Sequence, residues 1–183
     1  MEPKDLKKKF RVGISGHRDL KLSKIDQYKR EMTNILEELV KKYPDNEIFV
    51  VTALADGADR LMVECAVALG LRYEVILPMP VELYRDDFDE MSKKEFDTLF
   101  LNASASKSVA LLDGILEEQI KHYGKERDRQ YLAVGEEVVN RSDTMLFLWD
   151  GVVNGLTGGT ADIVEYTKHV DKSYFIIKCK RKK

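Results

Sequence analysis

Cysteine, histidine and tryptophan are scarce in this chain, and their shortage excludes several kinds of site. The 183 residues include 2 cysteines, 3 histidines and 1 tryptophan. Cys65 and Cys179 lie far apart in the sequence, and two cysteines cannot form a disulfide framework. The histidines are scattered without the spacing of metal ligands, so we expect no metal site and no cofactor.

Long hydrophobic runs and an excess of either charge are also missing. No uninterrupted apolar stretch approaches the roughly 20 residues that a membrane-spanning helix requires. The first nine residues contain no apolar run of signal-peptide length. The 30 basic residues nearly balance the 32 acidic ones, so no overall field attracts the chain to nucleic acid or membrane. We expect a cytoplasmic protein with no membrane partner and no nucleic-acid partner.

The sequence does contain enough apolar residues for one core. At 183 residues and 44% hydrophobic composition, a single domain can bury roughly 70% of the surface of the unfolded chain. No repeat or low-complexity linker divides the sequence, so we predict one domain over 1–183. Lysine-rich ends at 1–9 and 179–183 are expected to be solvated tails.

Strand-like and helix-like segments alternate along the chain. Continuous apolar strands that alternate with helices indicate a parallel sheet covered by helices on both faces. The predicted fold class is therefore α/β, with a doubly wound, mainly parallel sheet. The predicted strands are 10–14, 48–54, 73–77, 108–112, 144–149 and 174–177. The predicted helices are 24–43, 56–69, 92–102, 127–140 and 158–169.

A glycine-containing loop follows the first predicted strand. Ligands of open α/β sheets bind at the carboxyl ends of the strands, so this loop is a candidate binding segment. Glycine lets the backbone approach a ligand closely, and arginine can bind phosphate or carboxylate through two hydrogen bonds. We expect Arg18 to matter most, although it could instead pair with Asp19 or Asp56 and serve folding. The candidate residues are Ser15, Gly16, His17 and Arg18.

The loop after the second predicted strand opens a helix. A helix start attracts anions through unpaired backbone N–H groups and the helix dipole. Asp56 and Asp59 could bind ligand hydroxyls, or they could only cap the first turn. The candidate ligand-binding residues here are Asp56, Gly57, Ala58, Asp59 and Arg60.

The loop after the strand 144–149 holds four glycines within 151–159 and leads into another helix. Bare amides and a hydroxyl at that helix start suit a phosphate, although the loop could also be only a mobile surface segment. No lysine follows the glycines, which excludes the nucleotide triphosphatase loop. The candidate residues are Trp149, Asp150, Gly151, Gly158, Gly159 and Thr160.

The helix at 127–140 begins with two arginines and a tyrosine. We expect Arg129 and Tyr131 to reach the ligand, with the Tyr131 ring stacked on a base. Arg127 is expected to lie in an exposed basic turn. Trp149 is interpreted either as a rim residue against a base or as part of the core.

Four segments together resemble the SLOG superfamily, the group of Lonely Guy and DNA-processing protein A-like Rossmann domains. They are G-I-S-G-H-R at 13–18, A-D-G-A-D-R-L at 55–61, S-D-T-M-L-F-L-W-D-G at 142–151 and G-G-T-A-D-I-V at 158–164. The resemblance implies a Rossmann-like fold that binds a nucleotide or a nucleotide-derived ligand, with 81–125 as a family-variable insertion. Some members of the superfamily are sensor modules, which makes a sensor the leading hypothesis.

One position bears on whether the chain is an enzyme. Lonely Guy enzymes carry P-G-G-x-G-T-x-x-E, and placing Gly159-Thr160 on the G-T pair puts Ile163 at the glutamate. No catalytic residue is therefore assigned. The alternatives to a sensor are a nucleoside 5′-monophosphate phosphoribohydrolase and a purely structural or protein-interaction domain. Relatives pair through helices beside the site, and the broad apolar stripe of 24–43 leads us to expect a homo-oligomer.

Overall fold

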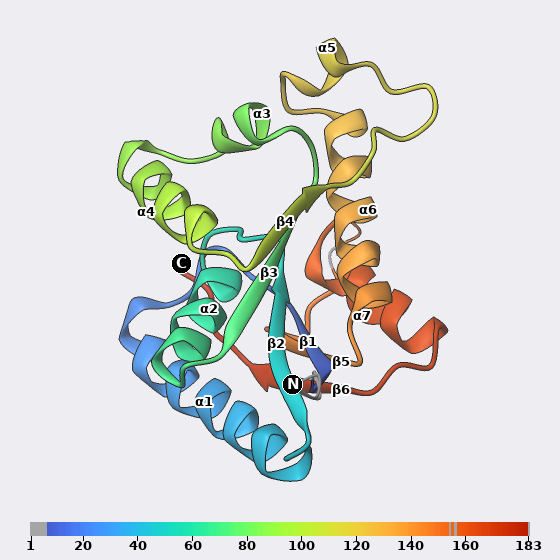
Figure 1. Cartoon of the computed structure of the whole chain (residues 1–183). Coiled ribbons are helices and arrows are strands. Elements are labelled where there is room, and N and C mark those ends of the chain that lie inside the picture. Colours follow the sequence, from blue (N-terminus) through green and yellow to red (C-terminus); the bar gives the residue numbers. More distant parts are fainter. Residues whose placement is uncertain (1–6, 154, 156, 183) are drawn as a thin grey trace.

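Six parallel strands form one sheet in the order β4-β3-β2-β1-β5-β6 (Figure 1). The computed structural model describes residues 7–153, 155 and 157–182. The prediction of an α/β fold with a parallel sheet is confirmed, and the fold is Rossmann-like. The strands are β1 (Lys8–Gly16), β2 (Asn46–Thr52), β3 (Arg72–Leu77), β4 (Ala105–Ser108), β5 (Thr144–Trp149) and β6 (Tyr174–Lys178).

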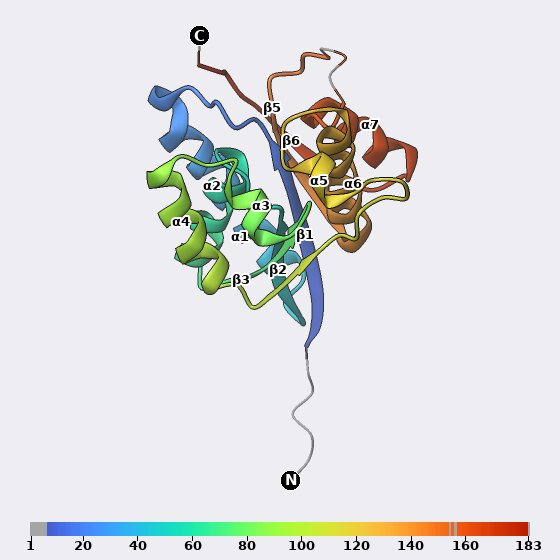
Figure 2. The same cartoon turned by 90° about the horizontal axis from the view of Figure 1, so that it is seen from above.

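Helices cover both faces of the sheet, as predicted. On one face lie α1, α2 and α4, and on the other lie α6 and α7 (Figures 1 and 2). The helices are α1 (Ile25–Lys42), α2 (Ala58–Ala68), α3 (Val81–Arg85), α4 (Glu90–Leu101), α5 (Glu117–Ile120), α6 (Lys125–Arg141) and α7 (Thr160–His169). No helix in the described part of the chain is long and apolar enough to cross a membrane.

The chain reverses its direction across the sheet beside β1. From β1 it moves outward through β2 and β3 to β4, and α6 then returns it to β5 on the other side of β1. Helices that follow β1 and β5 consequently lie on opposite faces of the sheet. Such a switch point leaves a crevice at the carboxyl ends of the two strands, which is where ligands of open α/β sheets bind.

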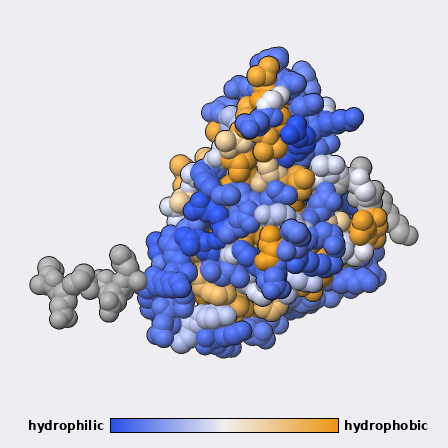
Figure 3. Space-filling model, turned by 90° about the vertical axis from the view of Figure 1, so that its right-hand side faces the viewer, coloured by the Kyte–Doolittle hydropathy of each residue, from blue (hydrophilic) through white to orange (hydrophobic). Residues whose placement is uncertain are grey.

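The apolar stripe of α1 packs against the sheet. Tyr28, Met32, Leu36 and Leu39 are each at most 4% exposed. Burying such a side chain contributes roughly 1.5–3 kcal/mol, so this helix is a major part of the core. The stripe that suggested an oligomer contact is thus used within the chain. The surface on the α6–α7 side is mostly hydrophilic, with separate hydrophobic patches (Figure 3), and the homo-oligomer stays a prediction.

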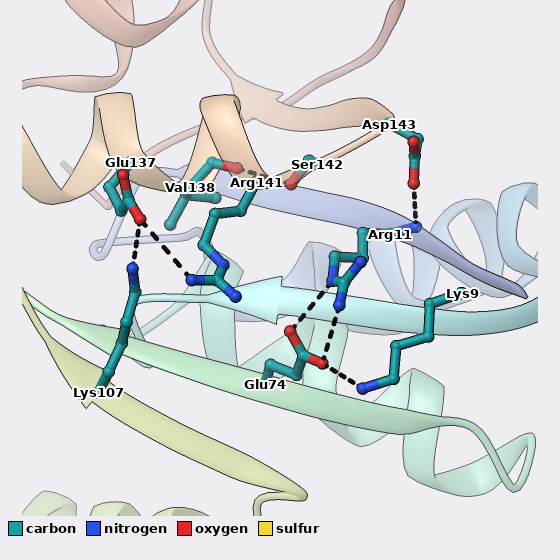
Figure 4. Close-up of polar contacts among 9 residues, drawn as sticks. All are labelled: Lys9, Arg11, Glu74, Lys107, Glu137, Val138, Arg141, Ser142 and Asp143. Carbon is teal, nitrogen blue, oxygen red and sulfur yellow. Dashed lines mark hydrogen bonds and ion pairs between the residues drawn. The ribbon is translucent and has the colours of Figure 1, made fainter.

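Ion pairs also lie on the face of the sheet that α6 covers (Figure 4). Glu74 of β3 is 6% exposed and accepts hydrogen bonds from Lys9 Nζ at 2.8 Å and Arg11 Nε at 3.1 Å. Burial alone would raise the pKa of Glu74, but these two cations outweigh it and hold that pKa below its usual range. A second group on this face consists of Lys107, Glu137 and Arg141.

Parts of both predicted basic tails belong to the fold. Lys8 and Lys9 belong to β1, while residues 1–6 lie outside the described part of the chain. At the other end, Cys179 is 4% exposed and Arg181 forms an isolated antiparallel bridge with Leu20. Backbone hydrogen bonds therefore hold the segment 179–182 in the fold, while the side chains of Lys180, Arg181 and Lys182 are exposed, and Lys183 is not described.

The middle of the chain is more structured than its sequence pattern suggests. Residues 81–125 contain α3, α4 and α5, and they supply the edge strand β4. The strand predicted at 108–112 is wrong, because β4 spans Ala105–Ser108. All four of its side chains are exposed, so this edge strand lacks the apolar run by which the buried strands were recognised.

Candidate functional site

A cavity of about 520 Å³ lies at the carboxyl ends of β1 and β5, at the switch point of the sheet. Its volume falls within the range of roughly 300–1,000 Å³ that is usual for small-molecule sites. Ten predicted residues line it: Ser15, Gly16, His17, Arg18, Asp59, Tyr131, Trp149, Gly158, Gly159 and Thr160. Seven others do not: Asp56, Gly57, Ala58, Arg60, Arg129, Asp150 and Gly151.

Two glycines allow β1 and α2 to approach each other at the floor of the cavity. A Cβ on Gly16 would lie 2.5 Å from Ala58 Cβ and 2.6 Å from the Leu148 carbonyl oxygen. Gly57 has φ +76°, and its Cβ would lie 2.5 Å from the carbonyl oxygen of His17. The Ala58 N–H donates to that same His17 oxygen at 3.1 Å. The start of α2 therefore holds the β1 loop, instead of presenting this amide to a ligand as predicted.

Asp59 enters the cavity wall from the first turn of α2 and does not cap the helix. It is 4% exposed, and its carboxylate accepts hydrogen bonds from Thr52 Oγ1 at 2.9 Å and from Ala53 N at 3.0 Å. Burial raises the pKa of Asp59 to about 6, and the Thr52 hydrogen bond and the charge of Arg18 offset only part of that rise. The cavity thus contains a carboxyl group that can change protonation near neutral pH.

Arg60 serves packing and lies outside the cavity. It is 2% exposed, and its guanidinium lies 4.5 Å from the centre of the Phe88 ring. Its Nη1 atom lies 2.9 Å from Asp56 Oδ1 and 2.8 Å from Glu95 Oε2, so it joins α2 to α4. Asp56 is engaged in the same contacts and is not a cap. The segment 56–60 contains three charged residues, and the sequence alone could not reveal which of them faces the core.

Arg18 projects into the cavity with only loose contacts to protein groups. Its side chain is 41% exposed, and Nη2 lies 3.7 Å from Asp87 Oδ2. The guanidinium also lies 5.7 Å from the centre of the Tyr131 ring. The aspartates that could have competed for it have other partners, since Asp19 contacts Arg181 and Asp56 contacts Arg60. The guanidinium is therefore available to an anion.

A buried network orients the Tyr131 side of the cavity. The Tyr131 hydroxyl donates to Asp87 Oδ2 at 2.6 Å and accepts from Arg127 Nε at 2.7 Å. Burial and the Asp87 carboxylate together raise the pKa of Tyr131. Arg127 is 3% exposed, so the prediction of an exposed basic turn is wrong for it. Arg129, one residue beyond Asp128, is exposed and does not line the cavity.

The other wall is built by the end of β5. Trp149 is 9% exposed, and its Nε1 has no hydrogen-bond partner among the described residues. Next to it, Asp150 Oδ1 lies 3.0 Å from His17 Nε2, within ion-pair range but outside the direction of a hydrogen bond. Burial alone would raise the pKa of Asp150, but the Val152 amide, His17 and Arg181 lower it. Asp150 and His17 thus join the loops after β5 and β1.

The glycine-rich loop packs its end against α6 and opens α7. Gly158 has φ +81°, and a Cβ there would lie 2.8 Å from the Asp128 carbonyl oxygen. Its N–H donates to Asp162 Oδ2 at 2.8 Å, and Thr160 begins the helix at the cavity wall. The end of the loop is therefore fixed. The predicted site residue Gly151, also at positive φ, lies in open space outside the lining, and residues 154 and 156 are not described.

Sequence reasoning missed several residues of the site. Tyr84 and Arg181 line the cavity, and Asp87 contacts Arg18. Tyr84 and Asp87 come from the irregular segment 81–125, and Arg181 comes from a presumed tail. The one available signal was Tyr84 shortly after Pro80, because a segment that follows a strand-ending proline lies at the carboxyl edge of the sheet.

The lining combines two arginine cations, helix amides, carboxylates and aromatic rings. Arg18 and the amides at the start of α7 suit an anionic group, and Asp59 can accept hydrogen bonds from hydroxyls. The rings of Tyr131 and Trp149 offer apolar surface to a flat group. No cluster of three or more possible metal ligands occurs within 7–153, 155 and 157–182.

The comparisons with known proteins bear on the fold. Neither a protein-family model nor a curated protein matches the chain. Among solved structures, DNA processing protein A from Streptococcus pneumoniae is similar, with a TM-score of 0.62 and 11% sequence identity. The match covers 93% of this chain and 51% of that chain. The chain therefore shares the Rossmann-like fold of that structure and spans about half its length.

Proposed function

We propose that this chain binds a nucleotide or a nucleotide-derived ligand in the cavity at the β1–β5 switch point and acts as a sensor module. The observation that carries the proposal is the meeting of Arg18, the start of α7 and the buried Asp59 in one cavity. An anionic group, sugar hydroxyls and a base are the chemistry that these groups would recognise together. The resemblance of four sequence segments to the SLOG superfamily agrees with this fold.

Isothermal titration against AMP, GMP, CMP, UMP, cyclic nucleotides and ADP-ribose tests the proposal. Binding of at least one of them with a single site per chain is the expected result. Folded protein that binds none of them contradicts the proposal and favours a structural or interaction domain. The expectation of no nucleic-acid partner stays a prediction, and the similarity to a DNA processing protein gives it no support.

Hydrolysis of a nucleoside 5′-monophosphate is the second candidate, favoured by the protonatable Asp59. In that reaction water adds to C1′ of the ribose, the bond to the base breaks, and the departing base takes up a proton. Against this candidate, Ile163 occupies the position of the Lonely Guy glutamate and is 2% exposed, packed beside Gly135. Chromatography that detects free base released from AMP, and loses it in Asp59→Asn, would favour hydrolysis over sensing.

A further inference from the structure

The C-terminal segment 179–182 forms part of the cavity wall. It continues β6 past the carboxyl end of β5 and runs beside the segment that follows β1 (Figure 2). Backbone hydrogen bonds fix it to both neighbours. They run from Cys179 N to the Trp149 carbonyl (3.0 Å), from Lys21 N to the Lys180 carbonyl (2.9 Å) and from Lys182 N to the Asp19 carbonyl (2.7 Å).

Within this segment, Arg181 lines the cavity. Its Nε lies 2.9 Å from Asp19 Oδ1 and 3.0 Å from Asp19 Oδ2. Its Nη1 lies 4.0 Å from Asp150 Oδ2, too far for a hydrogen bond. Among the described residues neither Nη atom donates a hydrogen bond, so the forked end of the guanidinium is unoccupied.

We infer that Arg181 is a ligand-binding residue that takes an anionic group, such as a phosphate, of the ligand in this cavity. The inference rests on the proposed function for the presence of a ligand, and it adds a cation from a different segment of the chain. The two Nη atoms can bind two oxygens of one phosphate, a geometry that lysine cannot reproduce. Asp19 and Asp150 position Arg181 toward that group.

The contacts that hold Arg181 leave it free to bind. The Arg181 and Asp19 side chains are each 42% exposed, and ion pairs of that exposure contribute little to stability. Asp150 also faces His17, so its charge is shared between two partners. An anion at the Nη atoms consequently displaces no strong interaction.

The opposing interpretation is that Arg181 only attaches the C-terminal segment to the β1 loop. The backbone hydrogen bonds already provide that attachment, and they do not depend on the side chain. Lys182 offers a matched control, because its exposed side chain carries the same charge one residue away and does not line the cavity. A charge-neutral substitution at each position separates a local role in binding from an effect of overall charge.

The experiment compares the wild-type chain, Arg181→Gln and Lys182→Gln in titrations with AMP and with inorganic phosphate. Affinity is followed by calorimetry, and the Arg181 Nε–Hε resonance of the wild type is followed by NMR. We expect Arg181→Gln to weaken AMP binding at least tenfold and Lys182→Gln to change it less than twofold. The Arg181 resonance should shift on addition of either anion, and this readout decides the question even if Arg181→Gln fails to fold.

The outcomes distinguish the two proposals. If AMP binds but Arg181→Gln behaves like Lys182→Gln, the assignment of Arg181 is overturned while ligand binding stands. If no nucleotide binds but phosphate shifts the Arg181 resonance, the nucleotide proposal fails and the anion site stands. If neither phosphate nor any nucleotide of the panel affects the wild type, both are overturned.

Discussion

Replacing Gly57 with alanine should damage both the fold and the cavity, because this glycine is confined by backbone and not by flexible side chains. Its φ and ψ of 76° and −117° fall in a region that only glycine enters readily. An added Cβ would also meet the carbonyl oxygens of His17 and Arg18 at 2.5 Å. The strain contributes about 1–3 kcal/mol by itself. The steric overlap adds to this strain, because the His17 carbonyl cannot move away without lengthening its hydrogen bond from the Ala58 N–H.

Gly70→Ala measures the backbone strain alone, so its difference from Gly57→Ala isolates the contribution of the overlap. Gly70 also has positive φ, +71°, but no atom lies within 4 Å of the position its Cβ would occupy. Left-handed backbone alone costs an alanine about 1–2 kcal/mol, so we expect a fall in Tm of roughly 2–8 °C for Gly70→Ala. For Gly57→Ala we expect about 3–5 kcal/mol in total and a fall of roughly 6–20 °C.

Thermal unfolding followed by circular dichroism measures the difference, and calorimetry with AMP measures its effect on the site. Displacement of the His17 and Arg18 backbone should weaken AMP binding in Gly57→Ala but not in Gly70→Ala. Equal losses of Tm in the two variants, or an unchanged affinity in Gly57→Ala, would refute the view that Gly57 sets the position of the β1 loop.

Three further predictions concern charged groups. Arg18→Ala should weaken AMP binding at least tenfold by calorimetry, while Arg129→Ala, with the same change of charge outside the cavity, should not. Both should leave Tm within a few degrees, and unfolding of the Arg18 variant would instead assign it to folding. Glu74→Gln should lower the free energy of unfolding by about 1–3 kcal/mol at pH 7. Because folding lowers the pKa of Glu74, this difference should shrink as denaturant titrations move below about pH 4, and a difference independent of pH would contradict the ion pairs. Folding raises the pKa of Asp59 to about 6, so the folded state keeps a proton that the unfolded state loses near pH 4. The free energy of unfolding should therefore fall as the pH rises from about 4 to about 6 in denaturant titrations, and Asp59→Asn should flatten that fall.

The sheet was predictable because its central strands are buried on both faces. The runs at 48–54 and 144–149 are continuous apolar segments, and the structure places β2 and β5 on them within two residues. The edge strand β4 could not be predicted in the same way, since an exposed strand pairs through its backbone and needs no apolar side chains. The helices α3 and α5 were not predicted for a different reason. They span only Val81–Arg85 and Glu117–Ile120, which is too short for a helical period of apolar residues to show in the sequence.

The parts of the candidate site in glycine-containing loops could be predicted. The placement of charged side chains could not, because it depends on partners far away in the sequence. Gly16 and Gly159 marked their loops because glycine permits close approach of backbone. By contrast, Arg60 and Arg18 are both arginines after apolar strands, yet one is 2% exposed beside Phe88 and the other projects into the cavity. Which arginine is buried depends on α4 and its Glu95, 35 positions further along the chain.

The cavity and the stability of the fold depend on the same close contacts. The switch point separates α2 from α6 and α7 onto opposite faces, which opens the crevice, while Gly16 and Gly57 let β1 and α2 close its floor. A side chain at either glycine would push the β1 loop into the space that a ligand needs. The arginines that would bind the ligand contribute little to folding, because the side chains of Arg18 and Arg181 are exposed and their contacts with other protein groups are weak. Substitutions of the glycines should therefore alter folding and binding together, whereas substitutions of the two arginines should alter binding alone.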